Sequence, residues 1–359
     1  MPGGVLPYQD KYIDENLLDY MKSFDFRIGT LECGVGTNIL FDKKKMESTK
    51  SIVFVRDCDL KRIVEMKFDI VSLANNHAFD LGVDGIKNAI KQLDDLGIKH
   101  FGAGMNIEEA KKPVVVQNGE QTIAIFGCLF DYRTPRVFHT ATSDEPGPYH
   151  TSIKEVSSYI KELKKRYDKV FVMPHWGEEH KYLQRGLFKS YAQQMIAAGA
   201  DCIIGSHPHI INPVVRFEGK SCFFSLGNFL FPEKCMQVPR PMYYPKTAEE
   251  CRSLKRMWTY PQKIAEPIVA VWKPKNRIGM MVEMDVSDCI KTRWHLVCLT
   301  ADNILHRYFS TIVRLRMKFW AMLLHMPKYD MLYRLHNSRF NLVKRAVDKM
   351  RAFNIPVQL

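Results

Sequence analysis

Short apolar runs that predict buried strands alternate along most of the chain with amphipathic stretches that predict helices. Residues 69–74 (DIVSLA) form such a run, and across residues 82–97 apolar side chains recur on one helical face until Gly97 ends the pattern. Asn-Gly at 118–119 and Glu-Gly at 218–219 separate β-rich runs and predict two hairpins. Further strands are predicted at 24–31, 98–104, 168–175, 201–210, 266–274, 278–287 and 292–301, and further helices at 152–167, 188–200, 313–326 and 338–353.

This order of elements predicts one large α/β domain at residues 1–300, followed by a basic helical extension at residues 301–359. Between residues 232 and 267 the composition shifts to Pro, Tyr, Lys and Arg without periodicity. We therefore expect a surface loop insert there, of the kind that often serves as a lid or a substrate loop. Nothing in the chain approaches the roughly 20 consecutive apolar residues that a membrane span needs.

Charge and cysteine content narrow the class of protein. The net charge is +13, and residues 301–359 hold eleven Lys and Arg against three Asp and Glu, which favours an anionic partner. Nucleic acid is the weakest candidate, because no RRM, KH, zinc-finger or helix-turn-helix signature is present. The nine cysteines are scattered and form no CxxC pair, which fits reduced thiols. No secretory signal is visible in the sequence. We therefore expect a cytoplasmic protein, with peripheral membrane association as the alternative.

Polar side chains of the kinds that bind metals follow four of the predicted strands. They are Glu32, Asn76, His77, His175, His207 and His209. In open α/β sheets the residues just past the strand ends line the ligand crevice, so we expect these groups to converge. Imidazole, carboxylate and amide ligands without thiolate suit zinc, manganese or iron, and two such ions lower the pKa of a bridging water for hydrolysis.

At this point the chain resembles a known family. The segments LANNHAFDLGVDGI, GIKHFGAG, PHWGEEH, AGADCIIGSHPHIINPV and FFSLGNFLF resemble, in order and spacing, motifs of the CapA family of capsule and poly-γ-glutamate synthesis proteins, which are similar to calcineurin-like metallophosphatases. The resemblance covers roughly residues 1–235. It implies a four-layer α/β/β/α sandwich that binds two divalent transition metals (Mn, Fe or Zn) at the strand ends.

The resemblance also assigns roles. It implies that Glu32 is the bridging carboxylate, that Asn76 and His175 are metal ligands, and that His207 and His209 close the ligand set. His77 resembles the family's catalytic acid, and a histidine suits that role because its unperturbed pKa near 6.5 lets it give a proton at neutral pH.

Other residues of the motifs have two interpretations each. Gly102, Ala103 and Gly104 either offer backbone N–H groups to an anionic substrate or form a structural turn, and Ser225, Gly227 and Asn228 either line the substrate pocket or support it from behind. Asp80 and Asp84 either orient neighbouring groups or cap the following helix, and we favour capping.

One departure from the family concerns its first strand, which ends in a Gly-Asp whose aspartate is a metal ligand. The chain begins MPGGVLPYQDKY, which resembles the residues that follow this Gly-Asp, so we hypothesise that the strand and its aspartate lie upstream. Asp10 and Asp14 are not convincing replacements, because they fall in a polar loop and at a helix start.

Two functions from different classes remain. The first is a metal-dependent hydrolase, phosphoesterase-like or amide-cleaving, that acts on an anionic or carbohydrate polymer precursor in capsule, exopolysaccharide or poly-γ-glutamate synthesis. The alternative is a non-catalytic assembly or binding factor for such a polymer. The basic residues 301–359 either contact a membrane-associated synthase or an anionic membrane, or form the solvated face of a helix packed on the domain.

Overall fold

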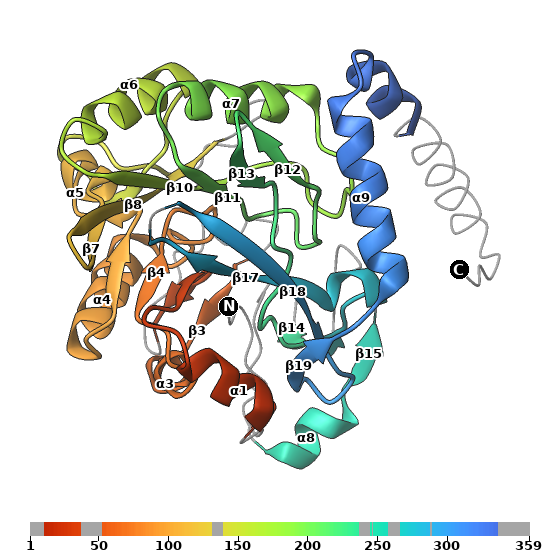
Figure 1. The fold of residues 1–359 in the computed structure, drawn as a ribbon. Helices are drawn as coiled ribbons and strands as arrows, with labels where there is room; N and C mark the ends of the chain where they lie inside the picture. Colours follow the sequence, from red (N-terminus) through yellow and green to blue (C-terminus); the bar gives the residue numbers. More distant parts are fainter. Residues whose placement is uncertain are drawn as a thin grey trace.

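The computed structural model describes residues 11–36, 52–130, 139–236, 245, 247–257, 266–287 and 289–336 (Figure 1). Its largest sheet has six strands in the order β12-β13-β11-β10-β8-β7. The four inner strands are parallel, and the edge strands β7 and β12 close the two predicted hairpins in antiparallel fashion. The strands are β7 (Val114–Asn118), β8 (Gln121–Leu129), β10 (Lys169–His175), β11 (Cys202–Ile204), β12 (Val214–Phe217) and β13 (Lys220–Phe223).

A second layer of strands lies against this sheet. It comprises a parallel sheet in the order β1-β4-β5 and an antiparallel sheet in the order β17-β18-β19. The two layers approach closely at Gly127 of β8, where an added Cβ would lie 2.7 Å from the Ser72 hydroxyl and 3.0 Å from the Phe101 ring. The strands are β1 (Ile28–Thr30), β4 (Ile70–Ser72), β5 (Lys99–Phe101), β17 (Ile278–Asp285), β18 (Lys291–Leu299) and β19 (Leu305–Tyr308).

Helices cover both outer faces. Two of them, α6 (Ile153–Leu163) and α7 (Gly186–Ala197), pack on the six-stranded sheet, while α1 (Glu15–Lys22), α3 (Asp57–Glu65) and α4 (Gly82–Asp95) cover the other layer (Figure 1). The predicted four-layer α/β/β/α sandwich is therefore confirmed. Smaller elements are β2 (Gly34–Val35), β3 (Phe54–Val55), β6 (Ala103–Gly104), α5 (Ile107–Lys111), β9 (Gly147–Pro148) and the 3₁₀ turn η1 (Pro274–Asn276).

The described parts of the predicted loop insert at 232–267 contain regular structure. Strand β14 (Lys234–Met236) and strand β15 (Lys255–Met257) flank β16 (Ile268–Ala270) in a small sheet, and helix α8 (Ala248–Ser253) precedes β15. Each strand is only three residues long, so no period was visible in the sequence. The pairing depends on β16, which lies more than 30 residues beyond β14 along the chain.

The C-terminal segment is joined to the domain. Strand β19 pairs with β18, so the sheet continues past the predicted boundary at residue 300. Helix α9 (Thr311–His325) then packs one face on the core of the six-stranded sheet. The helix predicted at 338–353 lies outside the described residues. In the part of the chain that the structure describes, no helix has both the length and the apolar character that a membrane crossing requires.

Candidate metal centre

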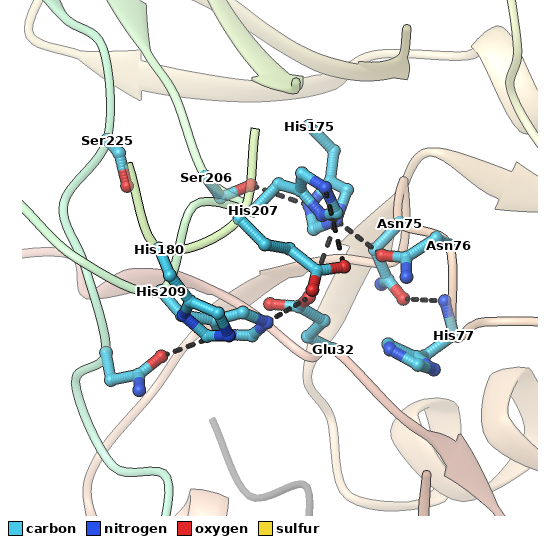
Figure 2. Close-up of polar contacts among 12 residues, drawn as sticks. Glu32, Asn75, Asn76, His77, His175, His180, Ser206, His207, His209 and Ser225 are labelled. Atoms are coloured by element: carbon cyan, nitrogen blue, oxygen red, sulfur yellow. Dashed lines mark hydrogen bonds and ion pairs between the residues drawn. The ribbon is translucent and has the colours of Figure 1, made fainter. Parts of the chain in front are cut away.

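The polar groups that the sequence placed after four strands meet at one point between the two strand layers (Figure 2). Glu32 follows β1, Asn76 and His77 follow β4, and His175 is the last residue of β10. His207 and His209 follow β11, which pairs with β10 in parallel. Glu32, His175 and His207 each place a potential ligand atom within 4.8 Å of the others.

Glu32 lies at the centre of this cluster with its charge buried. Its Oε1 atom is 3.5 Å from Nε2 of His175 and 3.5 Å from Nε2 of His209. No hydrogen-bond donor among the described residues reaches Oε1, although the atom is buried. A buried carboxylate oxygen without a donor costs several kcal/mol unless a cation compensates it, so this atom fits a metal ion.

The His175 ring faces more acceptor atoms than one proton can satisfy. Its Nε2 lies 2.7 Å from Oδ1 of Asn76 and 3.0 Å from Nδ1 of His207, in addition to Glu32. Burial, and then the neighbouring histidines, hold the pKa of His175 well below its usual value. A neutral imidazole surrounded by oxygen and nitrogen lone pairs is the form in which histidine binds metals.

Hydrogen bonds on the far side of two rings fix their orientation. Nδ1 of His175 lies 2.9 Å from the Ser206 hydroxyl. Nδ1 of His209 donates to Oδ1 of Asn228 at 2.9 Å, and the Asn228 amide in turn donates to the carbonyl of Asn276. In both rings Nε2 is therefore left to face the cluster, as metal-binding histidines require.

The backbone at His207 and His209 is in the left-handed region. The φ angle is 98° at His207 and 55° at His209. Each such conformation costs about 1–3 kcal/mol in a residue other than glycine and persists only where the surroundings impose it. Both residues belong to the cluster: Nδ1 of His207 lies 3.0 Å from Nε2 of His175, and Nε2 of His209 lies 3.5 Å from Oε1 of Glu32.

His77 forms a second unit beside the cluster. Its Nδ1 donates to Oδ2 of Asp80 at 2.7 Å, and Asp80 also accepts the Val53 N–H at 2.6 Å. Burial acts to lower the pKa of His77, but the charge and hydrogen bond of Asp80 outweigh it and the pKa is raised. Asn75 ties this loop to the Glu32 loop by donating to the Leu31 carbonyl.

The capping role that we favoured for Asp80 is wrong. The residue at the helix N-cap is Leu81, which makes no side-chain cap bond, and the Asp80 carboxylate turns instead to His77. Asp84 lies in the first turn of α4. Asp14 accepts the N–H groups of Asn16 and Leu17 and so caps α1, as expected of a residue that is not a ligand. Asp10 lies outside the described residues, and the aspartate expected upstream stays a prediction.

The remaining predicted residues contribute close packing. Gly102 has φ 89°, and an added Cβ would lie 2.6 Å from that of Ala74; at Gly104 it would lie 2.5 Å from Glu109. The Ser225 hydroxyl accepts the Gly227 N–H at 3.1 Å, and its side chain lies apart from the ligand cluster in Figure 2. These contacts explain why glycine occupies positions 102 and 104 and why serine occupies position 225. A substrate contact at these positions stays a prediction.

Three charged or titratable groups near the cluster were missed. Lys234 of β14 is buried, and no hydrogen bond to its Nζ is found among the described residues. Burial lowers the pKa of Lys234, opposed by the charges of Asp80, Glu32 and Glu179. Burial, followed by His209, lowers the pKa of His180 to about 4. Glu179 and His180 belong to the PHWGEEH motif, which could have revealed them; Lys234 follows an apolar run and carried no such signal.

Comparison with known proteins finds a family model and curated relatives that are similar to this chain. The family described as "Bacterial capsule synthesis protein PGA_cap" matches residues 3–233. "PGA biosynthesis protein CapA" of Bacillus subtilis (strain 168) is 35% identical over 176 residues, which are 48% of this chain and 45% of that protein. "Capsule biosynthesis protein CapA" of Bacillus anthracis is 29% identical over 232 residues, 63% of this chain and 55% of that protein. The chain spans about half the length of these curated relatives.

Solved structures give weaker similarity. A hypothetical protein from Thermus thermophilus aligns with a TM-score of 0.40 and 13% identity, covering 81% of this chain and 90% of that one. The NAD nucleotidase NadN of Haemophilus influenzae aligns with a TM-score of 0.38 and 13% identity, covering 90% of this chain and 59% of that one. These scores are too low to carry an argument about function.

Proposed function

The chain belongs to the PGA_cap family of bacterial capsule synthesis proteins, and on that premise we propose that it is a metal-dependent hydrolase of polymer synthesis. The bond it cleaves is a phosphoester or an amide in a capsule, exopolysaccharide or poly-γ-glutamate precursor. The observation that supports the proposal best is the buried Oε1 of Glu32, which has imidazoles on two sides and no hydrogen-bond donor among the described residues.

Five side chains would hold the metals. Glu32 would be the central carboxylate ligand of two divalent transition ions, and Asn76, His175, His207 and His209 would complete the ligand set. When bound, such a pair supplies an activated water at neutral pH and charge stabilisation for the reacting group. Manganese, iron and zinc all accept this ligand set.

His77 would deliver the proton. Asp80 accepts the Nδ1 proton and its charge raises the pKa of His77, which favours the imidazolium form; the Nε2 proton of that form would pass to the leaving group. Asn75 fixes the backbone of His77 by accepting its N–H at 3.0 Å. These two contacts keep the His77 ring beside Asn76. The His77 ring itself would not bind the metals.

Lys234 would bind the anionic part of the substrate. Its ammonium lies 5.7 Å above the Phe231 ring, and the Phe231 ring lies 5.4 Å from that of His209. A buried ammonium without a hydrogen-bond partner is costly by itself, and a phosphate or carboxylate of the substrate would pair it.

The competing proposal is a non-catalytic assembly or binding factor for the same anionic polymer. The high positive charge favours it as well as the enzyme, because an anionic chain is attracted to a basic surface whether or not it is cleaved. The His77–Asp80 pair favours the enzyme, since a binding factor needs no oriented proton donor.

The decisive experiment measures metal content and turnover on the same samples. We expect the purified chain, supplied with Mn²⁺, Fe²⁺ or Zn²⁺, to hold transition metal by elemental mass spectrometry and to hydrolyse p-nitrophenyl phosphate or γ-glutamyl p-nitroanilide. The two substrates separate ester from amide cleavage. His77→Ala should retain the metal and lose about 10²–10⁴-fold in rate, which is the usual contribution of a general acid.

Two controls keep this test specific. His100→Ala removes a histidine on β5, away from the ligand set, and should leave both metal content and rate unchanged. If His77→Ala turns over as fast as the wild type, His77 is not the acid. If the metal-loaded protein cleaves neither probe and His77→Ala still supports polymer production in cells, the assembly factor is the correct function.

A further inference from the structure

Helix α9 has two apolar faces, and only one of them is covered by described residues. Val313, Met317, Trp320 and Leu324 are buried against the core of the six-stranded sheet. On the opposite face Ile312 is 78% exposed, Leu315 60%, Phe319 53% and Met322 56%. Their spacing of three and four residues places them in one line along a helix about 22 Å long.

The exposed line continues beyond the helix. Phe309 precedes it with 75% exposure, and Met326, Met331 and Leu335 follow it. Eight of the thirteen large apolar side chains that are exposed among the described residues fall between 309 and 335. Single exposed apolar residues are ordinary on a protein surface, but a contiguous patch of this kind marks an interaction site. We call Phe309, Ile312, Leu315, Phe319, Met322 and Met326 the α9 row.

Basic side chains flank the α9 row, and acidic ones are absent from residues 303–329. The Arg314 guanidinium stacks over the Trp294 ring at 4.5 Å, and that of Arg316 stacks over Tyr182 at 4.6 Å. Lys318 and Lys328 are exposed, and neither forms an ion pair among the described residues. The patch is therefore apolar along its centre and cationic at its edges.

The segment that follows the α9 row is tied to the domain by hydrogen bonds. Residues 329–336 are helical and contact the loop that follows the metal ligand His175. The Tyr329 hydroxyl donates to the Gln184 carbonyl at 2.5 Å, and Asp330 accepts the Gly186 N–H at 3.0 Å. Tyr333 donates to the buried carboxylate of Glu178. A surface fixed in this way loses little entropy when a partner covers it.

We propose that the α9 row docks this domain onto an anionic lipid surface as a peripheral membrane face. An apolar line flanked by Arg and Lys is the pattern of helices that lie in the membrane interface, with large apolar side chains among the acyl chains and cations near the lipid phosphates. This inference uses no residue of the metal centre and stands independently of the proposed hydrolase.

A second copy of the chain fits the row less well. The spacing of Ile312, Leu315, Phe319, Met322 and Met326 would suit a coiled-coil pair. Two such helices, however, would bring Arg314, Arg316 and Lys318 of both copies together without a carboxylate between them. Opposite charges beside the apolar seam favour helix pairing and like charges oppose it, whereas anionic lipid supplies negative charge everywhere along the row.

Vesicle flotation tests the proposal with the full chain. We expect the wild type to float with phosphatidylcholine vesicles that contain phosphatidylglycerol, at least about tenfold more than with phosphatidylcholine alone, and to lose most of this preference at high salt. The double variant Leu315→Ser/Phe319→Ser should lose binding about tenfold or more, because it removes two large apolar groups from the row. Lys318→Glu should weaken binding to the anionic vesicles alone.

Two controls guard against misfolding and non-specific adhesion. Leu96→Ser removes an exposed leucine from the end of α4, remote from the row, and should bind vesicles as the wild type does. His77→Ala should also bind normally, so that failure of the hydrolase and failure of the membrane face are distinguished. Thermal melting must show that the double variant is folded.

Three results would overturn the proposal. The first is equal vesicle binding by the wild type and the folded double variant. The second is equal binding to neutral and anionic vesicles, which would remove the role of the cations. The third is a wild-type dimer in light scattering that becomes a monomer in the double variant without vesicle binding by either, which would assign the row to a second copy.

Discussion

Two buried glutamates of this protein have opposite surroundings. Glu233 forms ion pairs with Arg256 and Arg277, and its backbone N–H donates to Asn303 at 2.9 Å. Glu32 is almost as deeply buried, yet its Oε1 has no donor among the described residues and its neighbours are imidazole nitrogens. The first carboxylate is paired with cations of the chain, whereas the second lies where the proposed metal ions would bind.

This difference shows that the burial of a carboxylate does not by itself reveal its role. A buried carboxylate held by two guanidinium groups has its charge compensated within the fold and by itself says little about function. A buried carboxylate oxygen that no donor reaches, faced by imidazole nitrogens, costs free energy in the absence of a cation and is the arrangement expected of a metal ligand. Substitution of each glutamate by glutamine separates these roles, because glutamine keeps the shape and removes the charge.

Glu32→Gln should lose its bound metal. We expect metal content measured by elemental mass spectrometry to fall to background, together with hydrolysis. Metal-free Glu32→Gln should melt no lower than the metal-free wild type, since the change removes an uncompensated buried charge. Metal should raise the melting temperature of the wild type alone, because it binds only the folded ligand set. An unaltered metal content in Glu32→Gln would refute the assignment of Glu32 as a ligand.

Glu233→Gln should give the converse result. Removing one partner of a buried ion pair leaves the other charge uncompensated, and we expect a loss of about 3 kcal/mol in the free energy of unfolding. The value lies at the lower end for such pairs because Arg256 is 53% exposed and can turn to water. Metal content should not change. Denaturant titration of both variants in parallel is the measurement, and comparable stability losses would erase the distinction between the two carboxylates.

Lys234 is next to Glu233 in the chain, yet its surroundings resemble those of Glu32, because its charge is also buried without a hydrogen-bond partner among the described residues. Glu233 directly precedes β14 and pairs with the two arginines, whereas the charges of Asp80, Glu32 and Glu179 act on the ammonium of Lys234, the first residue of β14. We expect Lys234→Met to weaken inorganic phosphate binding to the metal-loaded protein about 10- to 100-fold, as for the loss of a hydrogen bond to a charged group. The measurement is isothermal titration calorimetry.

Lys328→Met, at an exposed lysine after α9, is the matched control and should bind phosphate normally. If Lys234→Met changes metal affinity instead and leaves phosphate binding as it was, the ammonium compensates the charge of Glu32 and does not contact the substrate.

The residues of the candidate metal centre show which parts of the site could be predicted from the sequence. Glu32, His175, His207 and His209 are polar residues just past apolar runs, and parallel pairing brings strand ends together, so their convergence was predictable. Asp80 was misassigned because its position before an amphipathic stretch suits a helix cap, and only the folded loop turns it to His77. Lys234 depends on the pairing of β14 with β16, which is remote in sequence.

Helix α9 illustrates a further limit of the sequence. Its apolar residues occupy two faces, so the sequence alone could not decide between a helix packed on the domain and an interfacial helix. The structure shows that one face is packed on the domain and the other is exposed, which agrees with a helix packed on the domain; contact with a membrane stays a proposal. Which apolar side chain meets the core depends on the position of the six-stranded sheet, and no local pattern contains that information.

The smallest expected effect concerns the support of His209. Asn228 accepts the Nδ1 proton of His209 and thereby directs Nε2 toward Glu32, so Asn228→Ala should weaken metal affinity about tenfold without abolishing it. Competition with a chelator of known affinity measures the change. Asn228→Asp retains an acceptor oxygen and should restore most of the affinity, whereas a merely structural role would leave both variants equally stable and equally tight. An affinity loss in Asn228→Ala that Asn228→Asp repairs would show that the cluster depends on oriented rings as well as on the Glu32 charge.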